Sequence, residues 1–387
     1  MQSHAPLRST LTRGRPVGPP PLRRLRSAAG RVAREAALWP RIAAAATGPG
    51  PSVAFLPSEG PVGASLLRAY NIAHALRAHG WRSLVIPPHL RLGQRQRILG
   101  VFRPDLVVVQ QCRHPLNRVA HLDGRRLVLD IDDADFLDSA LRPELDAMAT
   151  VAAGVICGSR FIRDWAATLN GNTVIVWTGT PPSAGTPPEH AARAPIVTWA
   201  QASPLGYAAE FDYVRDVVKR VAARTGTVRF RLYGWDGQDD HPALADLRAA
   251  GVSVDLLPFM PYPAFVASLR EVAVGLSAIV PRGFSQGKSF GKILGYLDAD
   301  VPVICSDAAD HALFFAPGSG VVSNDPEVWA EAVADLLADP ARRSAMAAAA
   351  RARFLDELSL AAAARKVHAF LAPLTGRALA PPAAGVA

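Results

Sequence analysis

Hydrophobic residues in this chain form short continuous runs that are separated by amphipathic stretches. Between residues 53 and 177 the runs are SVAFLP, RSLVIP, DLVVVQ, RLVLDI, GVICGS and NTVIVW. Short apolar runs of this kind are typical of strands that are covered on both faces. After the first run, LLRAYNIAHALRAHG has helical spacing and ends on Gly80, a usual helix C-cap. This half of the chain therefore predicts a parallel sheet between layers of helices.

The same alternation begins again after an interruption. Residues 178–194 hold four prolines and few apolar residues, which predicts a linker. The pattern then resumes with PIVTWA, VRFRLYG, VSVDLLPF, VAVGLSAI and GSGVVS. Helices are expected near residues 207–223, 242–250, 262–270, 326–354 and 358–371. The fold class is thus α/β, with two doubly wound domains, and ligands of such a pair bind between the carboxyl ends of the strands.

This reading divides the chain of 387 residues into six parts. A length of this order agrees with two domains, because a single core rarely grows past roughly 250–300 residues. The parts are a basic extension (1–50), an N-terminal domain (51–177), the linker (178–194), a C-terminal domain (195–354), a terminal helix (355–375) and a disordered tail (376–387).

Positive charge is concentrated in the extension. Residues 1–50 contain nine arginines and one acid, so the rest of the chain is nearly neutral although the whole carries +9. Overall basicity therefore does not indicate a nucleic acid partner. The extension is either a solvated, disordered segment or a basic surface that attaches the protein to anionic lipid.

Several classes of protein are excluded by what the sequence lacks. The three cysteines lie far apart without a CxxC pair, which predicts buried thiols in a reducing compartment. There is neither an uninterrupted run of 18 apolar residues nor a secretory signal pattern, so we expect a cytoplasmic protein. The histidines show no metal-ligand spacing and no G-x-S-x-G elbow occurs. No metal and no cofactor are expected.

The stretch RGFSQGKSFGKILGYLD, residues 282–298, combines glycines with Lys288 and Lys292, two of only four lysines in the chain. A Walker A loop would need glycine at position 282, which is arginine. An amphipathic helix with solvated lysines is a second interpretation, because Phe290, Ile293 and later apolar residues follow helical spacing. In a third interpretation, the N-terminus of this helix faces the cleft. The amides of its first turn, together with the two lysines on one face of the helix, would then bind a diphosphate without a metal.

The segment VAVGLSAIVPRGFSQGKSFGKILGYLDADVPVICSD resembles the donor-site segment of family 4 GT-B glycosyltransferases, which runs strand, loop, GKSxxKxxEYMAxGxPVVAS and strand. Other segments resemble the family in the same order: SEGPVGASLLRAYNIAHALRAHG, GVICGSRFIRDW, NTVIVWTGTP, PIVTWAQASPLGY and VRFRLYG. The resemblance covers residues 53 to about 371. It implies a GT-B fold, in which two Rossmann-like domains face each other across a cleft and the C-terminal helix packs back towards the N-terminal domain.

The resemblance also implies an activity. A family member of hexosyltransferase type would move a sugar from a nucleoside-diphosphate sugar, with UDP or GDP, to a saccharide, lipid-linked or other acceptor. Retention of configuration, no metal, and a role in bacterial polysaccharide or glycoconjugate biosynthesis would be expected. Contact with the inner face of the membrane would come through the Arg-rich extension. Two alternatives stay open: a sugar-nucleotide epimerase of the same fold, and a degenerate copy that binds sugar or nucleotide without turnover.

Candidate site residues follow from the motifs and from this resemblance. LVLDIDDADF puts carboxylates at the end of a strand on the acceptor side, although an ordinary helix-capping turn would look the same. SEGPVGAS either lends amides to phosphates or is a tight turn. The diphosphate candidates are Gly287, Lys288, Ser289, Lys292, Arg282, Gly60 and Gly63; the nucleoside candidates are Tyr233, Gly234, Gly295 and Tyr296; the acceptor-side candidates are Arg68, Asp132 and Asp133. The catalytic candidates are Lys288, Lys292, Asp132 and Asp133.

Two positions depart from the family pattern. The glutamate that usually binds the ribose hydroxyls of the donor is replaced by Gly295, and the first acid of the E-x7-E pair is replaced by Gly287. Asp298 and Asp300 are the nearest acids, but neither has the matching spacing. These departures motivate the non-catalytic alternative.

Overall fold

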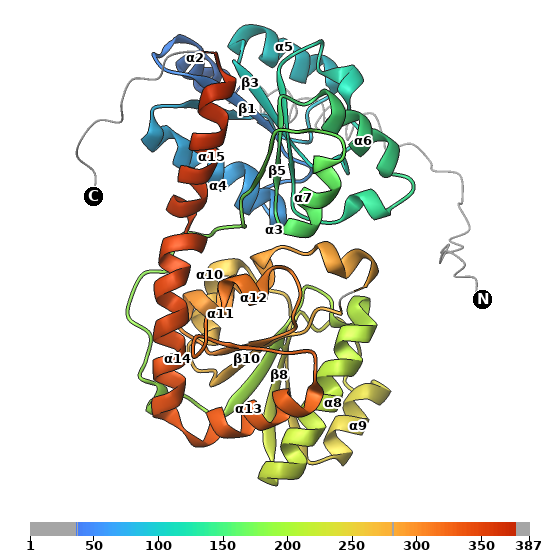
Figure 1. The fold of residues 1–387 in the computed structure, drawn as a ribbon, viewed down its shortest axis with the longest axis vertical. Coiled ribbons are helices and arrows are strands. Elements are labelled where there is room, and N and C mark those ends of the chain that lie inside the picture. Colours follow the sequence, from blue (N-terminus) through green and yellow to red (C-terminus); the bar gives the residue numbers. More distant parts are fainter. Residues whose placement is uncertain (1–35, 37, 281, 377–387) are drawn as a thin grey trace, which may run out of the picture.

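The protein folds into two α/β domains stacked one above the other (Figure 1). This computed structural model describes residues 36, 38–280 and 282–376, apart from the side chain of Lys292. The predictions for residues 1–35 and for the tail from 377 onward lie outside the described residues. Each domain contains a six-stranded sheet in which all pairings are parallel.

The N-terminal sheet has the strand order β2-β1-β3-β4-β5-β6. Every strand predicted between residues 53 and 177 is present. The strands are β1 (Ser52–Leu56), β2 (Arg82–Val85), β3 (Leu106–Gln110), β4 (Leu127–Ile131), β5 (Gly154–Cys157) and β6 (Thr173–Ile175). Most of their residues are buried, as expected for a sheet covered on both faces.

The helix predicted after the first strand is present as one continuous stretch, in which α-helical, π-helical and 3-10 segments follow one another. It runs through α3 (Gly63–Ser65), a π-helical turn (Leu66–Tyr70), α4 (Asn71–Ala75) and a 3-10 turn (Leu76–His79). Gly80 ends it with a left-handed φ of 79°, as predicted. The helices that follow it along this domain are α5 (Leu92–Phe102), α6 (Arg142–Val151) and α7 (Arg160–Ala167), with 3-10 turns at Val119–His121 and Asp135–Leu137.

The N-terminal domain begins earlier than the predicted boundary at residue 51. Helix α2 (Trp39–Thr47) packs on α5 and β2, and Ile42 is buried in the core of the domain. The sequence did not predict this helix as part of the domain, because it is rich in alanine and buries a single large apolar residue, Ile42. The end of the predicted extension therefore belongs to the folded domain.

The C-terminal sheet has the strand order β12-β11-β10-β7-β8-β9. Its strands are β7 (Ile196–Ala200), β8 (Val228–Tyr233), β9 (Val252–Leu257), β10 (Val274–Ser277), β11 (Val303–Cys305) and β12 (Val321–Val322). Its helices are α8 (Ala208–Thr225), α9 (Pro242–Ala249), α10 (Tyr262–Leu269), α11 (Leu294–Asp298), α12 (His311–Phe314), α13 (Pro326–Ala338) and α14 (Pro340–Arg353). Short 3-10 turns lie at His190–Ala192 and Pro204–Tyr207.

The last helix, α15 (Leu360–Leu374), returns to the N-terminal domain, as the resemblance implied (Figure 1). It packs against α4, and Trp81 Nε1 donates to His368 Nδ1 at 2.9 Å. Where the chain crosses between domains, Thr180 pairs with Ser359, so the two crossing segments support each other. No helix in the described part of the chain has the length and apolar character of a membrane span.

A buried ion pair fixes the N-terminal sheet to the start of the linker. Arg68 Nε and Nη2 donate to the Asp130 carboxylate at 2.6 and 3.1 Å, and Nη1 donates to Val176 O at 2.9 Å and Thr178 Oγ1 at 3.2 Å. Arg68 is 3% exposed. The prediction that it contacts the acceptor is therefore wrong, because its guanidinium is enclosed and its donors are used within the fold.

We predict that Arg68→Ala destabilises the protein by about 3–5 kcal/mol, because it leaves the Asp130 carboxylate buried without a partner. Urea unfolding and the melting temperature measure the loss. Arg142→Ala is the control, since Arg142 forms an exposed ion pair with Asp146 that is worth about 1 kcal/mol or less. Equal effects of the two substitutions would contradict this account of the buried pair.

Candidate functional site

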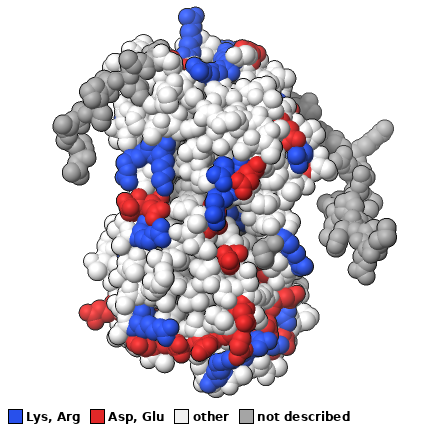
Figure 2. All heavy atoms as spheres, in the orientation of Figure 1, with Lys and Arg blue, Asp and Glu red and all other residues white. Residues whose placement is uncertain are grey.

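The loops at the carboxyl ends of β4 and β10 meet between the domains. Lys288, which follows β10, places its Nζ 2.9 Å from Oδ1 of Asp133, which follows β4. The side chains of Lys288 and Asp133 are 11% and 15% exposed, respectively. The structure thus brings together the lysine predicted for the donor and a carboxylate predicted for the acceptor. Figure 2 shows further charges of both signs around the waist between the domains.

The aspartates after β4 are all engaged by neighbouring side chains. Arg113 Nη2 lies 2.6 Å from both Asp133 Oδ2 and Asp135 Oδ1, and Gln111 Nε2 donates to Asp132 Oδ1 at 2.8 Å. Gln111 has a left-handed φ of 58°, a strained conformation for a residue other than glycine. Lys288 and Arg113 bind the two carboxylate oxygens of Asp133, and Arg113 binds both oxygens of Asp135, so these two carboxylates are paired with cations. Sequence reasoning missed Gln111 and Arg113, which have no motif of their own.

The neighbouring carboxylates of Asp132 and Asp133 have pKa values that are shifted in opposite directions. Burial, together with the adjacent charge of Asp133, raises the pKa of Asp132 to about 7. Burial would also raise the pKa of Asp133, but Lys288 and Arg113 outweigh it and hold this pKa below its usual range. Burial opposes the charge of Lys288, yet Asp133 and Tyr207 raise its pKa. One carboxylate is therefore paired and ionised, and its neighbour can exchange a proton near neutral pH.

Lys288 lies against aromatic rings as well as against the carboxylate. Its Nζ is 4.4 Å from the ring centroid of Phe284 and 5.8 Å from that of Tyr207. The next residue, Ser289, accepts a hydrogen bond from Thr178 Oγ1 at 3.2 Å. Both residues of the motif are thus held at the interface between the domains.

Two glycines allow this close approach. A Cβ on Gly287 would overlap Cβ of Ala134 in the other domain, and a Cβ on Gly158 would lie 3.3 Å from Cβ of Ser289. Both glycines let a segment of one domain lie close to a segment of the other. Gly287 therefore has a packing reason in this chain, because an acid in its place could not fit against the loop after β4.

The helix predicted to begin at the lysines is not formed there, so the expectation that both lysines lie on one helical face is wrong. Gly283–Gly287 is a 3-10 turn, Lys288 and Ser289 are extended, and Phe290–Lys292 is another 3-10 turn. Only Leu294–Asp298 is α-helical. Glycines recur every four residues through this stretch, and each lowers helix stability by about 1 kcal/mol relative to alanine. The side chain of Lys292 lies outside the described structure.

A buried acid on α8 anchors the motif loop. Glu210, 5% exposed, accepts from Ser285 Oγ at 2.7 Å and from Val280 N at 3.3 Å. The sequence analysis did not single it out, and an acid in the first turn of a helix is too common to mark a site. Its carboxylate reaches the loop that lacks its own acid at Gly287.

The predicted nucleoside contacts from Gly295 and Tyr296 are wrong. The Tyr296 side chain is 1% exposed, and its hydroxyl donates to Leu276 O at 3.1 Å and accepts from Ala200 N at 2.9 Å. At Gly295 a Cβ would lie 2.5 Å from Cε1 of Phe265, so this ring occupies the space that a longer side chain would use. Tyr296 is a core residue, and Gly295 is covered.

Tyr233 and Gly234 also serve packing. Tyr233 is 3% exposed, and its ring stands edge-on to Phe265 with centroids 5.0 Å apart. A base contact through the Tyr233 ring is therefore excluded in this conformation. Gly234 has a φ of 73°, and any Cβ there would overlap the carbonyl oxygen of Gln201. It is required by a tight turn.

The remaining diphosphate candidates lie outside the cluster. Gly60 lies in the turn before α3, where its carbonyl oxygen accepts from Val62 N at 2.7 Å, and Gly63 is the first residue of α3, with a φ of 49°. Arg282 is exposed in the loop after β10. In the described part of the chain, no hydrogen bond or ion pair joins these three residues to Lys288 or Asp133.

A second contact between domains uses Asp310. Its Oδ2 accepts from the backbone N of Arg160 at 2.9 Å and from Trp177 Nε1 at 3.0 Å. Asp310 and the preceding Ala309 both have left-handed φ values, 64° and 50°. This strained turn places a carboxylate of one domain at the start of α7 in the other, so the facing surfaces are held at two points.

Comparison of the coordinates with solved structures identifies the arrangement. Sucrose-phosphate synthase from Thermosynechococcus elongatus superposes with a TM-score of 0.65 at 14% identity, over 84% of this chain and all of that one. The protein has the GT-B fold. A glycosyltransferase from Rickettsia africae gives a TM-score of 0.62 at 12% identity, over 84% of this chain and 99% of that one.

HepE from Anabaena, solved with UDP and glucose, shares the GT-B fold with a TM-score of 0.57 at 13% identity, over 84% of this chain and all of that one. By sequence, residues 214–369 match a family model described as glycosyl transferase-like. No curated protein matches the chain in sequence. Within the GT-B fold, the matched segment contains the motif loop, Lys288 and Ser289.

We predict a pH dependence of stability from His311, which is fully buried beside Phe290. Its Nδ1 donates to Ser306 O at 2.9 Å, and burial lowers its pKa to about 4. The unfolded chain, with an ordinary pKa of about 6.5, takes up the proton first. Stability should therefore fall as the pH drops below about 6.5, by about 2 kcal/mol between pH 7.5 and 5.

Melting temperatures at pH 7.5 and 5.0 measure this term. The His311→Asn variant should lose the part of the decrease in stability at low pH that comes from His311. The control is His121→Asn, at a partly exposed histidine, which should show the same decrease as the parent protein. An unchanged decrease in His311→Asn would contradict the assignment.

Proposed function

We propose that the protein is a glycosyltransferase that moves a sugar from a nucleoside-diphosphate sugar to a saccharide or lipid-linked acceptor in polysaccharide or glycoconjugate biosynthesis. The observation that carries the proposal is the meeting of Lys288 and Ser289 of one domain with Asp132 and Asp133 of the other. The GT-B fold and the glycosyl transferase-like match of residues 214–369 support the same class of reaction. A hexose donor on UDP or GDP belongs to this proposal.

On the donor side, the diphosphate would replace Asp133 as the partner of Lys288. The ammonium group is already held at the interface by a carboxylate and by aromatic rings, so an anionic ligand meets a positioned charge. Negative charge develops on the leaving nucleoside diphosphate as the glycosidic bond breaks. A fixed cation in a site from which water is excluded stabilises that charge most effectively.

On the acceptor side, the released Asp133 and its neighbour Asp132 would orient the attacking hydroxyl. Gln111 and Arg113 hold these carboxylates in place, and Asp132 has a pKa near neutrality. A carboxylate of this kind can take a proton from a hydroxyl at physiological pH. Retention of configuration and transfer without a metal, which the family resemblance implies, are part of the proposal.

A non-catalytic sugar- or nucleotide-binding protein is the second candidate, and one observation favours it. Phe265 fills the space beside Gly295 from which the family's ribose-binding carboxylate would project. The donor would then be held by its diphosphate and by apolar contacts. Binding of nucleotide without turnover over a panel of donors and acceptors would favour this candidate.

We predict that UDP or GDP raises the melting temperature of the protein and that Lys288→Ala weakens the binding roughly 10- to 100-fold. The lost charge-assisted hydrogen bond is worth about 1.5–3 kcal/mol. Titration calorimetry gives the affinities. Lys219→Ala is the matched control, because Lys219 forms a half-exposed pair with Asp246 far from the motif and its loss should leave the affinity unchanged.

Two results would contradict the donor site. If no nucleotide shifted the melting temperature, the donor assignment would be wrong. If Lys288→Ala bound the nucleotide as well as the parent protein, Lys288 would serve only the contact between domains.

We further predict that Asp133→Asn strengthens nucleotide binding about fivefold while it slows transfer. The neutral amide no longer competes with the nucleotide for Lys288, and a fivefold gain in affinity corresponds to about 1 kcal/mol. Asp138→Asn, an exposed acid of the same loop region, is the control for the change in charge. Weaker nucleotide binding by Asp133→Asn would mean that the carboxylate helps to build the site and does not compete for the lysine.

A further inference from the structure

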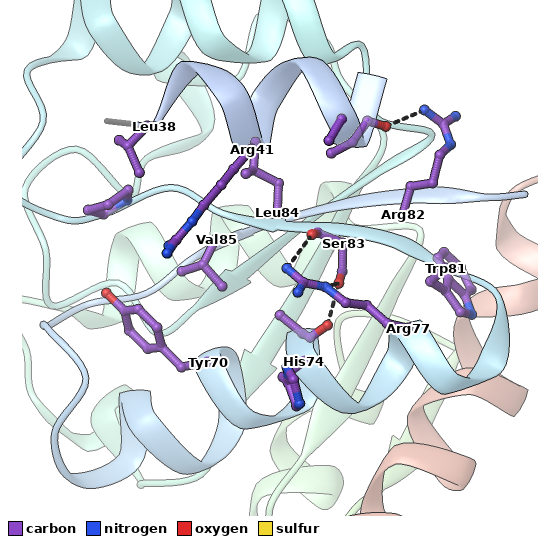
Figure 3. A pocket seen from close by; sticks show the side chains of 14 residues that line it. Leu38, Arg41, Tyr70, His74, Arg77, Trp81, Arg82, Ser83, Leu84 and Val85 are labelled. Carbon is purple, nitrogen blue, oxygen red and sulfur yellow. Dashed lines mark hydrogen bonds between the residues drawn. The ribbon is translucent and has the colours of Figure 1, made fainter. Parts of the chain in front are cut away.

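A groove of about 770 Å³ runs along the edge strand of the N-terminal sheet (Figure 3). Neither Lys288 nor Asp133 is among the residues that line it. Its floor is the edge strand β2. Helix α2 forms one wall, and the helical stretch from Tyr70 to Arg77 forms the other. The apolar residues that line it are Leu38, Ala44, Ala45, Ala73, Leu84, Val85 and Pro87.

The charged residues of the groove all have the same sign. Arg41, Arg77 and Arg82 line it together with His74, and no aspartate or glutamate is among the lining residues. None of the three arginines forms an ion pair with an acid elsewhere in the described structure. This contrasts with the second domain, where ion pairs such as Arg215–Asp246 are common. A groove with three uncompensated guanidinium groups favours an anionic occupant.

These cations come from different elements and are partly fixed. Arg82 Nη1 donates to the carbonyl oxygens of Ala45 and Ala46 at 2.6 and 3.0 Å, which fastens the end of α2 to β2. Arg77 bonds weakly to Ser83, at 3.3 and 3.4 Å, so most of its donors are available to a ligand. In Figure 3, Arg41 from α2 and Tyr70 from the opposite wall point towards one another across the space.

We propose that this groove is a binding site for the phosphate-bearing headgroup of an acidic lipid, which holds the N-terminal domain on an anionic membrane surface. The arginines would contact the phosphate, since a guanidinium matches its geometry with two parallel donors. The apolar walls would face the glycerol and the first methylene groups. This site is independent of the proposed donor site, and it would act whether or not the protein transfers a sugar.

Charge decides between this occupant and the chain's own N-terminal segment. Residues 1–35 contain eight arginines and a single acid, so they would be repelled from a cationic groove. The same segment would be attracted to the lipid surface that the groove contacts. The groove and the segment that precedes it therefore favour the same anionic partner.

The test is binding of the full chain to vesicles that contain phosphatidylglycerol and phosphatidylcholine, measured by flotation, with phosphatidylcholine vesicles as the blank. We expect Arg41→Gln/Arg77→Gln to weaken the binding roughly 30-fold. The matched control is Arg229→Gln/Arg248→Gln, which removes the same charge from exposed positions of the second domain and should cause little loss.

A second variant fills the groove without changing the charge. Ala44→Trp places a large ring on the exposed, groove-lining face of α2 and should also weaken the binding. If only diffuse surface charge mattered, this tryptophan would leave the binding unchanged or strengthen it, and the groove would be ruled out. An equal loss in the two double variants would overturn the proposal in the same way.

Two further measurements separate the possible sources of the result. Glycerol 1-phosphate carries the headgroup chemistry without chains, and a stabilisation of the protein by it as strong as that by vesicles would assign the groove to a soluble phosphate. The change in melting temperature with UDP should be the same in all variants. That result separates a failure of the lipid site from a failure of the proposed transferase activity.

Discussion

The contact between Lys288 and Asp133 is the interaction around which the two domains are arranged. It joins the loop after β10 to the loop after β4 in a region where both side chains are almost enclosed. A buried charge is costly unless it is paired, so each partner holds the other in place. Arg113 extends the pairing to Asp135, and the charges remain balanced only while the domains touch. A ligand that is to reach Lys288 must therefore replace a carboxylate, and a diphosphate has the charge to do so.

The close approach of the domains also determines which residues the motif can contain. Gly287 lies against Ala134 of the other domain, and a Cβ on Gly158 would lie 3.3 Å from Cβ of Ser289, so an acid at Gly287 or a larger residue at Gly158 would separate the surfaces. Gly295 is covered by Phe265 of its own domain. At both departures from the family pattern, the space that a longer side chain would need is occupied, by the loop of the other domain at Gly287 and by an aromatic ring at Gly295.

The strands and the division into two domains could be predicted because buried parallel strands leave continuous apolar runs that few other structures produce. That Lys288 and Ser289 would lie close to Asp132 and Asp133 could be predicted, because loops at the carboxyl ends of strands converge in such a fold. Tyr296 could not, because a buried tyrosine whose hydroxyl is satisfied by backbone has the same sequence pattern as one that faces a ligand. The helix predicted at the lysines failed because the helical spacing of the apolar residues from Phe290 onward outweighed the four glycines, each of which lowers helix stability.

The positions of Gln111 and Arg113 show why function in this fold cannot be located from motifs alone. Both follow β3, the neighbour of β4, and their side chains reach across the sheet edge to the aspartates. Gln111 and Arg113 are about twenty residues from the aspartates in the chain. They reach the aspartates because β3 and β4 are neighbours in the sheet, and this strand order is a property of the folded protein. The strained φ of Gln111 persists because its amide is fixed on Asp132. The aspartate cluster after β4 is thus built by neighbouring strands, and the pairing of its carboxylates follows from their packing.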